Sequence, residues 1–417
     1  MGSFVLHGNI IDSESPERLR VAADSYLVCE EGRCTGVFSA LPERFSGLPL
    51  TDFGDRLILP GMTDLHLHAP QFAFRGLGMD LELLDWLNAR TFPEEAKYAD
   101  LSYAALAYGQ FVDCLRRSAT TRAVVFGTVH PAATTLLMEL LEASGLVSYV
   151  GKVNMDRDCP EALREADAAA SLAATEQWLA SARFAHTKPI LTPRFVPSTT
   201  EKLMTGLGRL CETYDLPVQS HLSENRNEVA WVKELHPDLP SYTAVYDTFG
   251  LLRPEKTIMA HAIYLSDEEK RLLRDKGVYL AHCAQSNANL TSGIMPLRRN
   301  LENGLTCTIA SDVAAGHTPA MNKQIALTIE ISKLYSLKHD REKALTIGEG
   351  LYLATKGPGR FYGQTGSFEK GYAFDALVIH MDDIEGLERT PFEKLQQFIY
   401  DGDDRNIIAR YVDGVSR

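Results

Sequence analysis

The sequence lacks the features of a membrane or a secreted protein. No uninterrupted apolar run approaches the roughly 18 residues that a membrane-spanning helix needs. The first residues, MGSFVLHGNIIDSESPE, contain neither the basic stretch nor the apolar stretch of a secretory signal peptide. From these absences we expect a cytoplasmic protein with no membrane segment.

Cysteine and positive charge are also scarce. The seven cysteines are odd in number, are scattered along the chain and form no CxxC pair, so we expect reduced thiols. The 55 acidic residues outnumber the 42 basic ones, which gives a formal net charge of −13. A nucleic-acid-binding protein needs the opposite balance of charge. We therefore expect a small neutral ligand and no nucleic-acid partner.

The order of short apolar runs predicts an α/β fold built on a barrel. After residue 57, runs of β-branched or apolar residues that end in polar residues alternate with amphipathic, helix-like segments. The eight runs are LILPGMTDLHLH, RAVVFGTVH, LVSYVGKVNMD, PILTPRF, PVQSHLSE, KTIMAHA, VYLAHCAQS and LTCTIASD. Eight strand–helix repeats are typical of a (β/α)₈ TIM barrel, which we assign to residues 58–362.

The two ends of the chain have a different pattern. Residues 1–57 and 363–417 contain short β-like stretches separated by polar turns. We expect both ends to combine into one small β-sandwich domain beside the barrel. The segment from Ala69 to Arg116, between the first two predicted strands, is longer than one crossover helix requires. An additional loop and helix should therefore cover the mouth of the barrel.

Ionisable residues follow five of the predicted strands, at the end of the barrel where active sites lie. His66 and His68 are two positions apart on one face of an extended chain, so both imidazoles can reach one ion. The later runs supply His221 with Glu224, His261, His282 and Asp312. Nitrogen and carboxylate ligands without a thiolate suit Zn²⁺ or Fe²⁺. Cys283 should point away from His282, to the opposite face, and belong to the core.

Several motifs carry a resemblance to a known family. PGMTDLHLH, SHLSEN, MAHA, AHCAQSN and ASDV together resemble the amidohydrolase superfamily, whose members hold a catalytic metal at the mouth of a distorted barrel. Within it, HAPQFAFRG, LLDWL followed by TFPEE, GKVNMD, TPRF, SHLSENRNEV and GDDRNI are similar to the guanine deaminases. The resemblance runs from about Leu57 to near the C-terminus. It implies a homodimer that hydrolyses guanine to xanthine and ammonia in purine catabolism.

The resemblance also implies how a metal is held. The ligands in the family pattern are His66, His68, His221 and Asp312. His261 would hydrogen-bond the metal-bound water instead of binding the ion. Relatives with two metals need a carboxylated lysine at the end of the fourth strand, where this chain reads PILTPRF. We therefore expect one ion per chain, zinc in the first place and Fe²⁺ as the alternative.

The residue types suggest how acids and bases would take part. A bound ion lowers the pKa of its water toward about 7, so that hydroxide is available at neutral pH. Asp312 would accept a proton from that water, and Glu224 would protonate the purine ring and later the departing ammonia. The alternative for Glu224 is a purely structural role as the carboxylate at the start of a helix.

Substrate recognition rests on fewer residues. Gln71 carries both a donor and an acceptor for a purine edge, and Arg194 offers only donors, which suits a carbonyl oxygen. Phe195 would stack on the ring or pack in the barrel wall. Trp86 would form a lid over the base or belong to the core. His282 is a further candidate for a substrate contact.

Three positions depart from the family pattern or stay open. Ala284 stands where proline usually follows the HC of the seventh run, and Ser311 precedes Asp312 where relatives usually read GTD. His317 would touch the substrate or cap a helix.

Two other functions compete with guanine deamination. A related deaminase or hydrolase acting on a pterin, a triazine or a modified purine would share the metal residues and differ at Gln71, Arg194 and the lid. A non-catalytic scaffold is the second alternative, and the presence of the metal set together with Glu224 argues against it.

Overall fold

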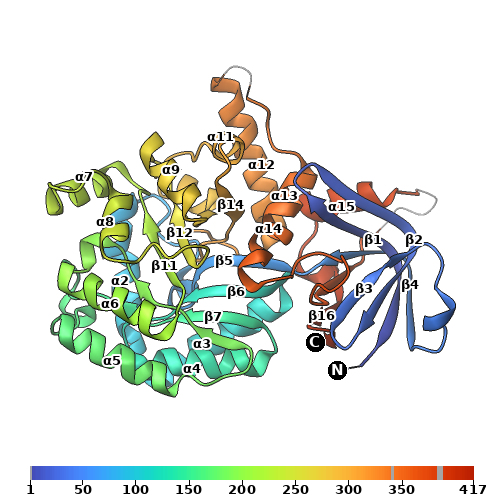
Figure 1. Cartoon of the computed structure of the whole chain (residues 1–417), viewed down its shortest axis with the longest axis horizontal. Coiled ribbons are helices and arrows are strands. Elements are labelled where there is room, and N and C mark those ends of the chain that lie inside the picture. Colours follow the sequence, from blue (N-terminus) through green and yellow to red (C-terminus); the bar gives the residue numbers. More distant parts are fainter. Residues whose placement is uncertain (1, 340–341, 383–387) are drawn as a thin grey trace.

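The computed structural model describes residues 2–339, 342–382 and 388–417. In Figure 1 a barrel surrounded by helices lies beside a smaller sheet to which both ends of the chain contribute. The barrel strands are β5 (Met62–His68), β6 (Thr120–Phe126), β7 (Val147–Gly151), β9 (Thr187–Pro189), β11 (Val218–Leu222), β12 (Thr257–His261), β13 (Tyr279–His282) and β14 (Thr306–Ile309). Each strand overlaps one of the runs singled out in the sequence, so the predicted (β/α)₈ barrel is confirmed.

The barrel is distorted because its strands form two separate sheets. All neighbours in the sheets β5-β6-β7-β9 and β11-β12-β13-β14 are parallel. A single bridge between Leu191 and Val218 joins the sheets on one side. On the other side the Asp312 N–H donates to the His66 carbonyl over 2.9 Å. The two residues expected to share an ion are thus tied together through their main chains.

Alternating side chains of the strands fill the inside of the barrel. This inner cluster consists of Leu65, Val124, Ile190, Ile258, Ala260, Tyr279, Ala281, Cys283 and Ala310. It is a packed core and forms a floor beneath the C-terminal ends of the strands.

Helices surround the barrel on the outside. The longer ones are α3 (Leu101–Arg117), α4 (Pro131–Ser144), α5 (Ala168–Ser181), α6 (Glu201–Tyr214), α7 (Arg226–Leu235), α9 (Asp267–Asp275) and α12 (Met321–Lys338). Shorter helices are α8 (Tyr242–Thr248), α10 (Ala284–Asn289), α11 (Leu297–Glu302), α13 (Ile347–Ala354) and α14 (Lys356–Gly359). Polar N-caps fix several starts: Thr200 accepts from the Leu203 N–H, and Asn225 forms a capping box with Glu228 at α7.

The long connection between β5 and β6 contains the additional segment expected from its length. It runs through short helical turns, among them α1 (Leu83–Trp86) and α2 (Phe92–Glu95), before α3 begins. We call residues 75–100 the inserted segment. Leu83, Trp86 and Phe92 are buried there, so the segment is packed onto the barrel.

Both ends of the chain build one seven-stranded sheet in the order β17-β16-β15-β4-β1-β2-β3. Its strands are β1 (Phe4–Ser15), β2 (Arg18–Glu30), β3 (Arg33–Phe38), β4 (Leu50–Pro60), β15 (Ala376–Ile379), β16 (Ile407–Val412) and β17 (Val415–Ser416). The strands expected as a sandwich therefore share one hydrogen-bonded sheet. Helix α15 (Pro391–Tyr400) lies in the C-terminal part.

The run LILPGMTDLHLH spans the junction of the sheet and the barrel. It contains the end of β4 and all of β5, so the boundary predicted after residue 57 falls inside β4. Gly61 separates the two strands, and a Cβ at this position would come within 2.2 Å of the Thr121 hydroxyl. The close approach of β6 requires glycine at this bend.

A buried ion pair links the two parts. Arg122 on β6 donates to Asp375 over 2.6 and 3.1 Å and to Asp413 over 2.6 Å. Arg122 is 5% exposed and Asp375 is 2% exposed. Two carboxylates from the C-terminal part of the chain thus hold β6, the second strand of the barrel.

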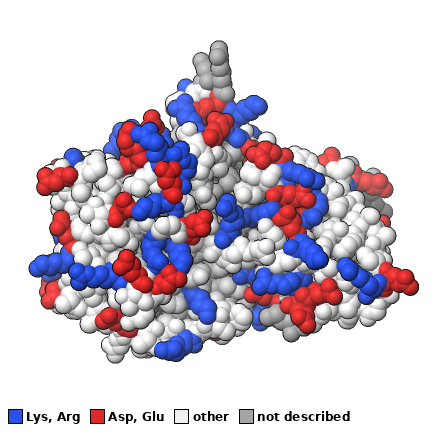
Figure 2. Space-filling view, viewed as in Figure 1, with Lys and Arg blue, Asp and Glu red and all other residues white. Residues whose placement is uncertain are grey.

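The surface in Figure 2 carries acidic and basic side chains side by side, without a continuous field of either sign. Across residues 2–339, 342–382 and 388–417, none of the helices has both the length and the apolar character required to cross a bilayer. All seven cysteines are free, as expected.

Candidate active site

A pocket of about 40 Å³ lies at the C-terminal ends of the barrel strands. Its lining residues are His68, Gln71, Leu83, Trp86, Leu87, Arg194, Phe195, His221, Glu224, Glu228, His261, Leu290, Asp312 and Ala315. Leu83, Trp86 and Leu87 come from the inserted segment, which therefore forms one wall of the pocket. Most of the candidates taken from separate strand ends meet here.

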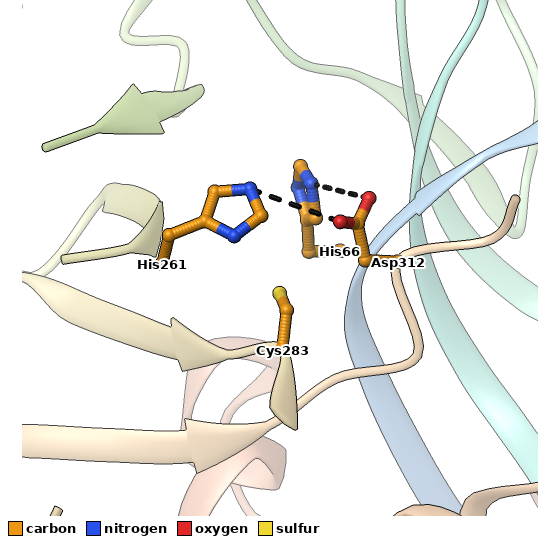
Figure 3. Close-up of side chains that lie close together, drawn as sticks. All are labelled: His66, His261, Cys283 and Asp312. Atoms are coloured by element: carbon orange, nitrogen blue, oxygen red, sulfur yellow. Dashed lines mark ion pairs between the residues drawn. The ribbon is translucent and has the colours of Figure 1, made fainter. Parts of the chain in front are cut away.

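Imidazole nitrogens and one carboxylate meet at the bottom of this pocket. The Asp312 Oδ1 atom lies 3.2 Å from His66 Nε2 and 3.4 Å from His68 Nε2. His68 Nε2 lies 3.2 Å from His221 Nε2. Figure 3 shows the His66 and His261 rings directed toward the Asp312 carboxylate.

The side chains of this cluster are arranged to bind a cation rather than to hydrogen-bond one another. Both ring nitrogens of His66 are buried and have no hydrogen-bond partner in the described part of the chain. His221 Nδ1 lies 2.7 Å from the Arg194 carbonyl oxygen, so Nδ1 carries the proton and Nε2 keeps its lone pair. The His221 lone pair, the unpartnered nitrogens of His66 and the Asp312 carboxylate therefore converge on a position that suits a positive ion. Three imidazoles and one carboxylate form a ligand set typical of Zn²⁺ or Fe²⁺.

Electrostatics keep these groups in the protonation states that bind metals. Burial lowers the pKa of His68 and of His221 well below the usual value, and the neighbouring His66 lowers both further. Burial opposes ionisation of Asp312, but the histidines beside it hold the pKa of its carboxyl far below the usual range. Neutral imidazoles and an ionised carboxylate are therefore present at neutral pH.

His261 and Glu224 form a second group beside the cluster. His261 Nε2 lies 3.4 Å from Glu224 Oε2 and 3.8 Å from Asp312 Oδ2. On the other side of the ring, Nδ1 lies 2.9 Å from the Asn287 side-chain oxygen and donates to it. Burial would lower the pKa of His261, but the carboxylates of Glu224 and Asp312 raise it above the usual value. His261 thus bridges two carboxylates.

Glu224 is placed for proton transfer near neutral pH. It is 4% exposed, and burial raises its pKa to about 7. The Ser292 hydroxyl donates to Glu224 Oε1 over 2.9 Å and leaves Oε2 facing His261. A carboxyl with such a pKa can both donate and accept a proton under physiological conditions.

Glu228, which the sequence analysis did not single out, holds the backbone at Glu224. Its Oε2 accepts from the N–H groups of Glu224 and Asn225 over 2.8 and 3.2 Å, and its Oε1 accepts from the Tyr242 hydroxyl over 2.7 Å. The signal for it was the spacing Asn225-x-x-Glu228, which is a capping box.

Glu95 is another residue that the sequence analysis did not single out. Its Oε2 lies 2.5 Å from Arg194 Nη1, and its Oε1 accepts from Gln71 Nε2 over 3.0 Å. All three side chains are at most 3% exposed. The acidic pair in TFPEE, inside the inserted segment, was the only signal in the sequence.

Phe195 and Trp86 line the same pocket and also pack into the fold. The Phe195 ring makes an edge contact with Trp231 at a centroid distance of 6.2 Å. Trp86 is 2% exposed, and its indole N–H donates to the Leu77 carbonyl over 3.1 Å. The two alternatives considered for Trp86 therefore coincide, because a buried tryptophan forms part of the pocket wall.

His282 and Cys283 point to opposite faces and Cys283 belongs to a core cluster, both as expected, but it is His282 that turns away from the pocket. Tyr279 and Ala281 face the inside of the barrel, so alternation turns His282 outward, where it lines a different cavity with Thr328 and Ile331. Its assignment to the substrate pocket is corrected accordingly. Cys283 turns inward, and its Sγ lies within 4.8 Å of ligand atoms of His66, His261 and Asp312 (Figure 3). Burial raises the pKa of this thiol well above the usual value, so it stays protonated and is a poor ligand.

The remaining open positions lie around the pocket. His317 is exposed, and its Nδ1 lies 3.2 Å from the Asn289 amide nitrogen, outside the pocket lining. The Ser311 hydroxyl donates to buried Asp64 over 2.5 Å. Ala284 is the first residue of α10.

Comparison with known proteins identifies the family. The model of the amidohydrolase family matches residues 57–416. The chain belongs to the amidohydrolase family. This membership agrees with the barrel and with the buried histidine and aspartate cluster at its mouth.

The most informative amidohydrolase relatives have one activity in their names. A guanine deaminase of Dictyostelium discoideum is 38% identical over 378 residues, which cover 87% of this chain and 83% of the relative. A crystal structure of a guanine deaminase from C. acetobutylicum with guanine bound in its active site is 45% identical, covers 99% of both chains and superposes with a TM-score of 0.97. The E. coli guanine deaminase structure is 30% identical, covers 99% of both chains and has a TM-score of 0.89.

Proposed function

We propose that this chain catalyses the hydrolytic deamination of guanine to xanthine and ammonia. The observation that carries the proposal is that one buried pocket contains a histidine–aspartate cluster, an acid of raised pKa and two groups able to recognise a purine edge. The relatives in Dictyostelium discoideum and C. acetobutylicum support the choice of guanine.

In this proposal His66, His68, His221 and Asp312 hold one metal ion. Zinc is the expected ion and Fe²⁺ the alternative. When bound, the ion supplies Lewis-acid activation of a water molecule at neutral pH. The His221 Nδ1 bond to the Arg194 carbonyl fixes the ring with Nε2 toward the ion site.

Proton transfer is assigned to the two carboxyl groups joined by His261. Asp312 accepts a proton from the attacking water. The His261 ring lies between this carboxylate and that of Glu224 and holds the two in position relative to each other. Glu224 protonates a ring nitrogen as the water oxygen bonds to the carbon that bears the amine. A second proton carried by Glu224 lets ammonia leave, so guanine and water become xanthine and ammonia.

Recognition of the base is assigned to Gln71 and Arg194, with Phe195 and Trp86 along the ring. Arg194 would donate to the carbonyl oxygen of guanine in a charge-assisted bond. Adenine carries an amino group at that position, and a buried guanidinium would then lack an acceptor. A site that hydrogen-bonds a substrate group can reject the analogue without it by roughly 10⁴–10⁵-fold.

The decisive experiment measures ammonia release from a panel of guanine, adenine, cytosine, a triazine and a 2-aminopterin, with kcat/KM for each. The proposal requires guanine to be the best substrate by a wide margin. Preference for the pterin or the triazine would assign the chain to another amidohydrolase activity. If none of the compounds releases ammonia, the non-catalytic alternative is the one supported. We further propose a cytoplasmic homodimer acting in purine catabolism, which sedimentation and cell fractionation would test.

A further inference from the structure

Glu95 contacts two residues that line the substrate pocket, Gln71 and Arg194, and belongs to none of the groups assigned above to metal binding or proton transfer. It is the last residue of α2 in the inserted segment, whereas Gln71 follows β5 and Arg194 follows the short strand β10 (Thr192–Pro193). One carboxylate thus connects three separate stretches of chain. The Arg194 guanidinium also lies over the Phe92 ring of α2, at 5.2 Å from its centroid.

The contact with Gln71 fixes the orientation of an amide. Gln71 Nε2 donates to Glu95 Oε1 over 3.0 Å, and Gln71 Oε1 accepts from the Ala314 N–H over 3.4 Å. A flipped amide would bring its oxygen against the carboxylate, acceptor against acceptor. Glu95 therefore determines which Gln71 atoms remain for a ligand: one N–H and one lone pair of the oxygen.

The contact with Arg194 balances the positive charge of its guanidinium. The bond to Glu95 uses one of the five N–H donors of the guanidinium and leaves the others for a ligand. Glu95 is 2% exposed and Arg194 is 3% exposed, so water cannot compensate either charge. A buried cation without its counterion would favour anionic ligands over a neutral base.

We propose that Glu95 is a positioning residue for substrate specificity, which orients Gln71 and Arg194 and balances the charge of Arg194 so that the pocket accepts a neutral purine with a carbonyl oxygen. This inference rests on the proposed guanine deamination. Glu95 acts through its two neighbours and takes no part in the proton transfers.

Glu94 provides a matched control. It is the adjacent carboxylate, is 8% exposed, and accepts from Lys97 Nζ over 2.6 Å and from the Tyr103 hydroxyl. Neither Glu94 nor Glu95 is among the residues that line the pocket, but Glu94 binds Lys97 and Tyr103, whereas Glu95 binds the lining residues Gln71 and Arg194. Both Glu94→Gln and Glu95→Gln remove one buried negative charge from neighbouring positions of the same helix.

The test compares wild type, Glu95→Gln, Glu95→Asp and Glu94→Gln with guanine and with 2-aminopurine, which has the same reacting amine and no carbonyl oxygen. Glu95→Gln should raise KM for guanine at least about 10-fold with kcat within about 3-fold. The ratio of kcat/KM for guanine over 2-aminopurine should fall at least about 10-fold, because the correct orientation of Arg194 is lost. Glu95→Asp keeps the charge and should restore part of this ratio.

Metal content and a thermal melt establish that each variant is folded, and Glu95→Asp carries the test if Glu95→Gln is insoluble. The inference is overturned if wild type deaminates guanine and Glu95→Gln behaves like Glu94→Gln, or if kcat falls while KM and the substrate ratio stay constant. Failure of wild type to release ammonia from guanine would instead overturn the proposed function.

Discussion

Replacement of Glu224 by glutamine tests the proton-transfer assignment most directly. The amide has nearly the same shape, and its oxygen can still accept from Ser292, whose hydroxyl lies 2.9 Å from Glu224 Oε1. It cannot exchange a proton with a ring nitrogen or with ammonia. We therefore expect kcat for guanine to fall while KM and bound metal remain close to wild type.

The expected loss in kcat follows from the role of Glu224 as a general acid. Positioned general acid–base catalysis contributes about 10²–10⁴-fold, which corresponds to about 3–5 kcal/mol of transition-state stabilisation. Burial, which raises the pKa of Glu224 to about 7, gives the wild-type residue the proton affinity that this role requires.

Steady-state ammonia release at saturating guanine, with metal content from the same samples, is the assay. Glu228→Gln is the control, because Glu228 is a buried carboxylate one helical turn away whose oxygens bind backbone N–H groups and Tyr242. Its kcat should fall by less than about 10-fold, since it takes no part in the chemistry. A Glu224→Gln enzyme that works at near wild-type rate would refute the assignment, and the acid would have to be another residue.

Three further predictions concern the metal, the base and the fold. The chain should bind about one equivalent of metal, and Asp312→Asn should lower both metal content and kcat; two tightly bound ions per chain in elemental analysis would contradict the single site. Arg194→Ala should lower kcat/KM for guanine at least about 10²-fold at unchanged metal content, because its carbonyl still holds His221; equal turnover of guanine and adenine by wild type would remove Arg194 from base recognition. Arg122→Met should lower the free energy of unfolding in urea by about 3–5 kcal/mol, because Asp375 is left buried without its partner; a loss below about 1 kcal/mol would show that the ion pair is not needed.

The sequence predicted the barrel because each strand is an apolar run with a polar end. His66, His68, His221, His261 and Asp312 could be found one by one, since parallel strands bring their C-terminal ends to the same edge. Alternation alone could not decide the direction of His282. The inner face of β13 is determined by its packing against β12 and β14, and Tyr279 and Ala281 occupy that face.

Glu95 and Glu228 could not be predicted as parts of the site for a different reason. Their roles depend on contacts between segments far apart in the chain, such as the 2.5 Å contact between Glu95 and Arg194. A carboxylate in a helical turn has the same appearance in a sequence whether it faces water or a buried guanidinium. The β domain shared by the two chain ends was predicted, but the order of its strands was not, because strand pairing across the whole chain leaves no local pattern.

The dual use of Arg194 limits how the base preference of this enzyme can be changed. Its carbonyl oxygen holds the His221 ring, while its guanidinium faces the purine pocket. An insertion or deletion after β10 would move both groups at once and disturb metal binding together with recognition. Leu83, Trp86 and Leu87 line the same pocket from the inserted segment and contribute no ligand to the cluster. Engineering of a new substrate should therefore keep the backbone at Arg194 fixed and vary the inserted segment.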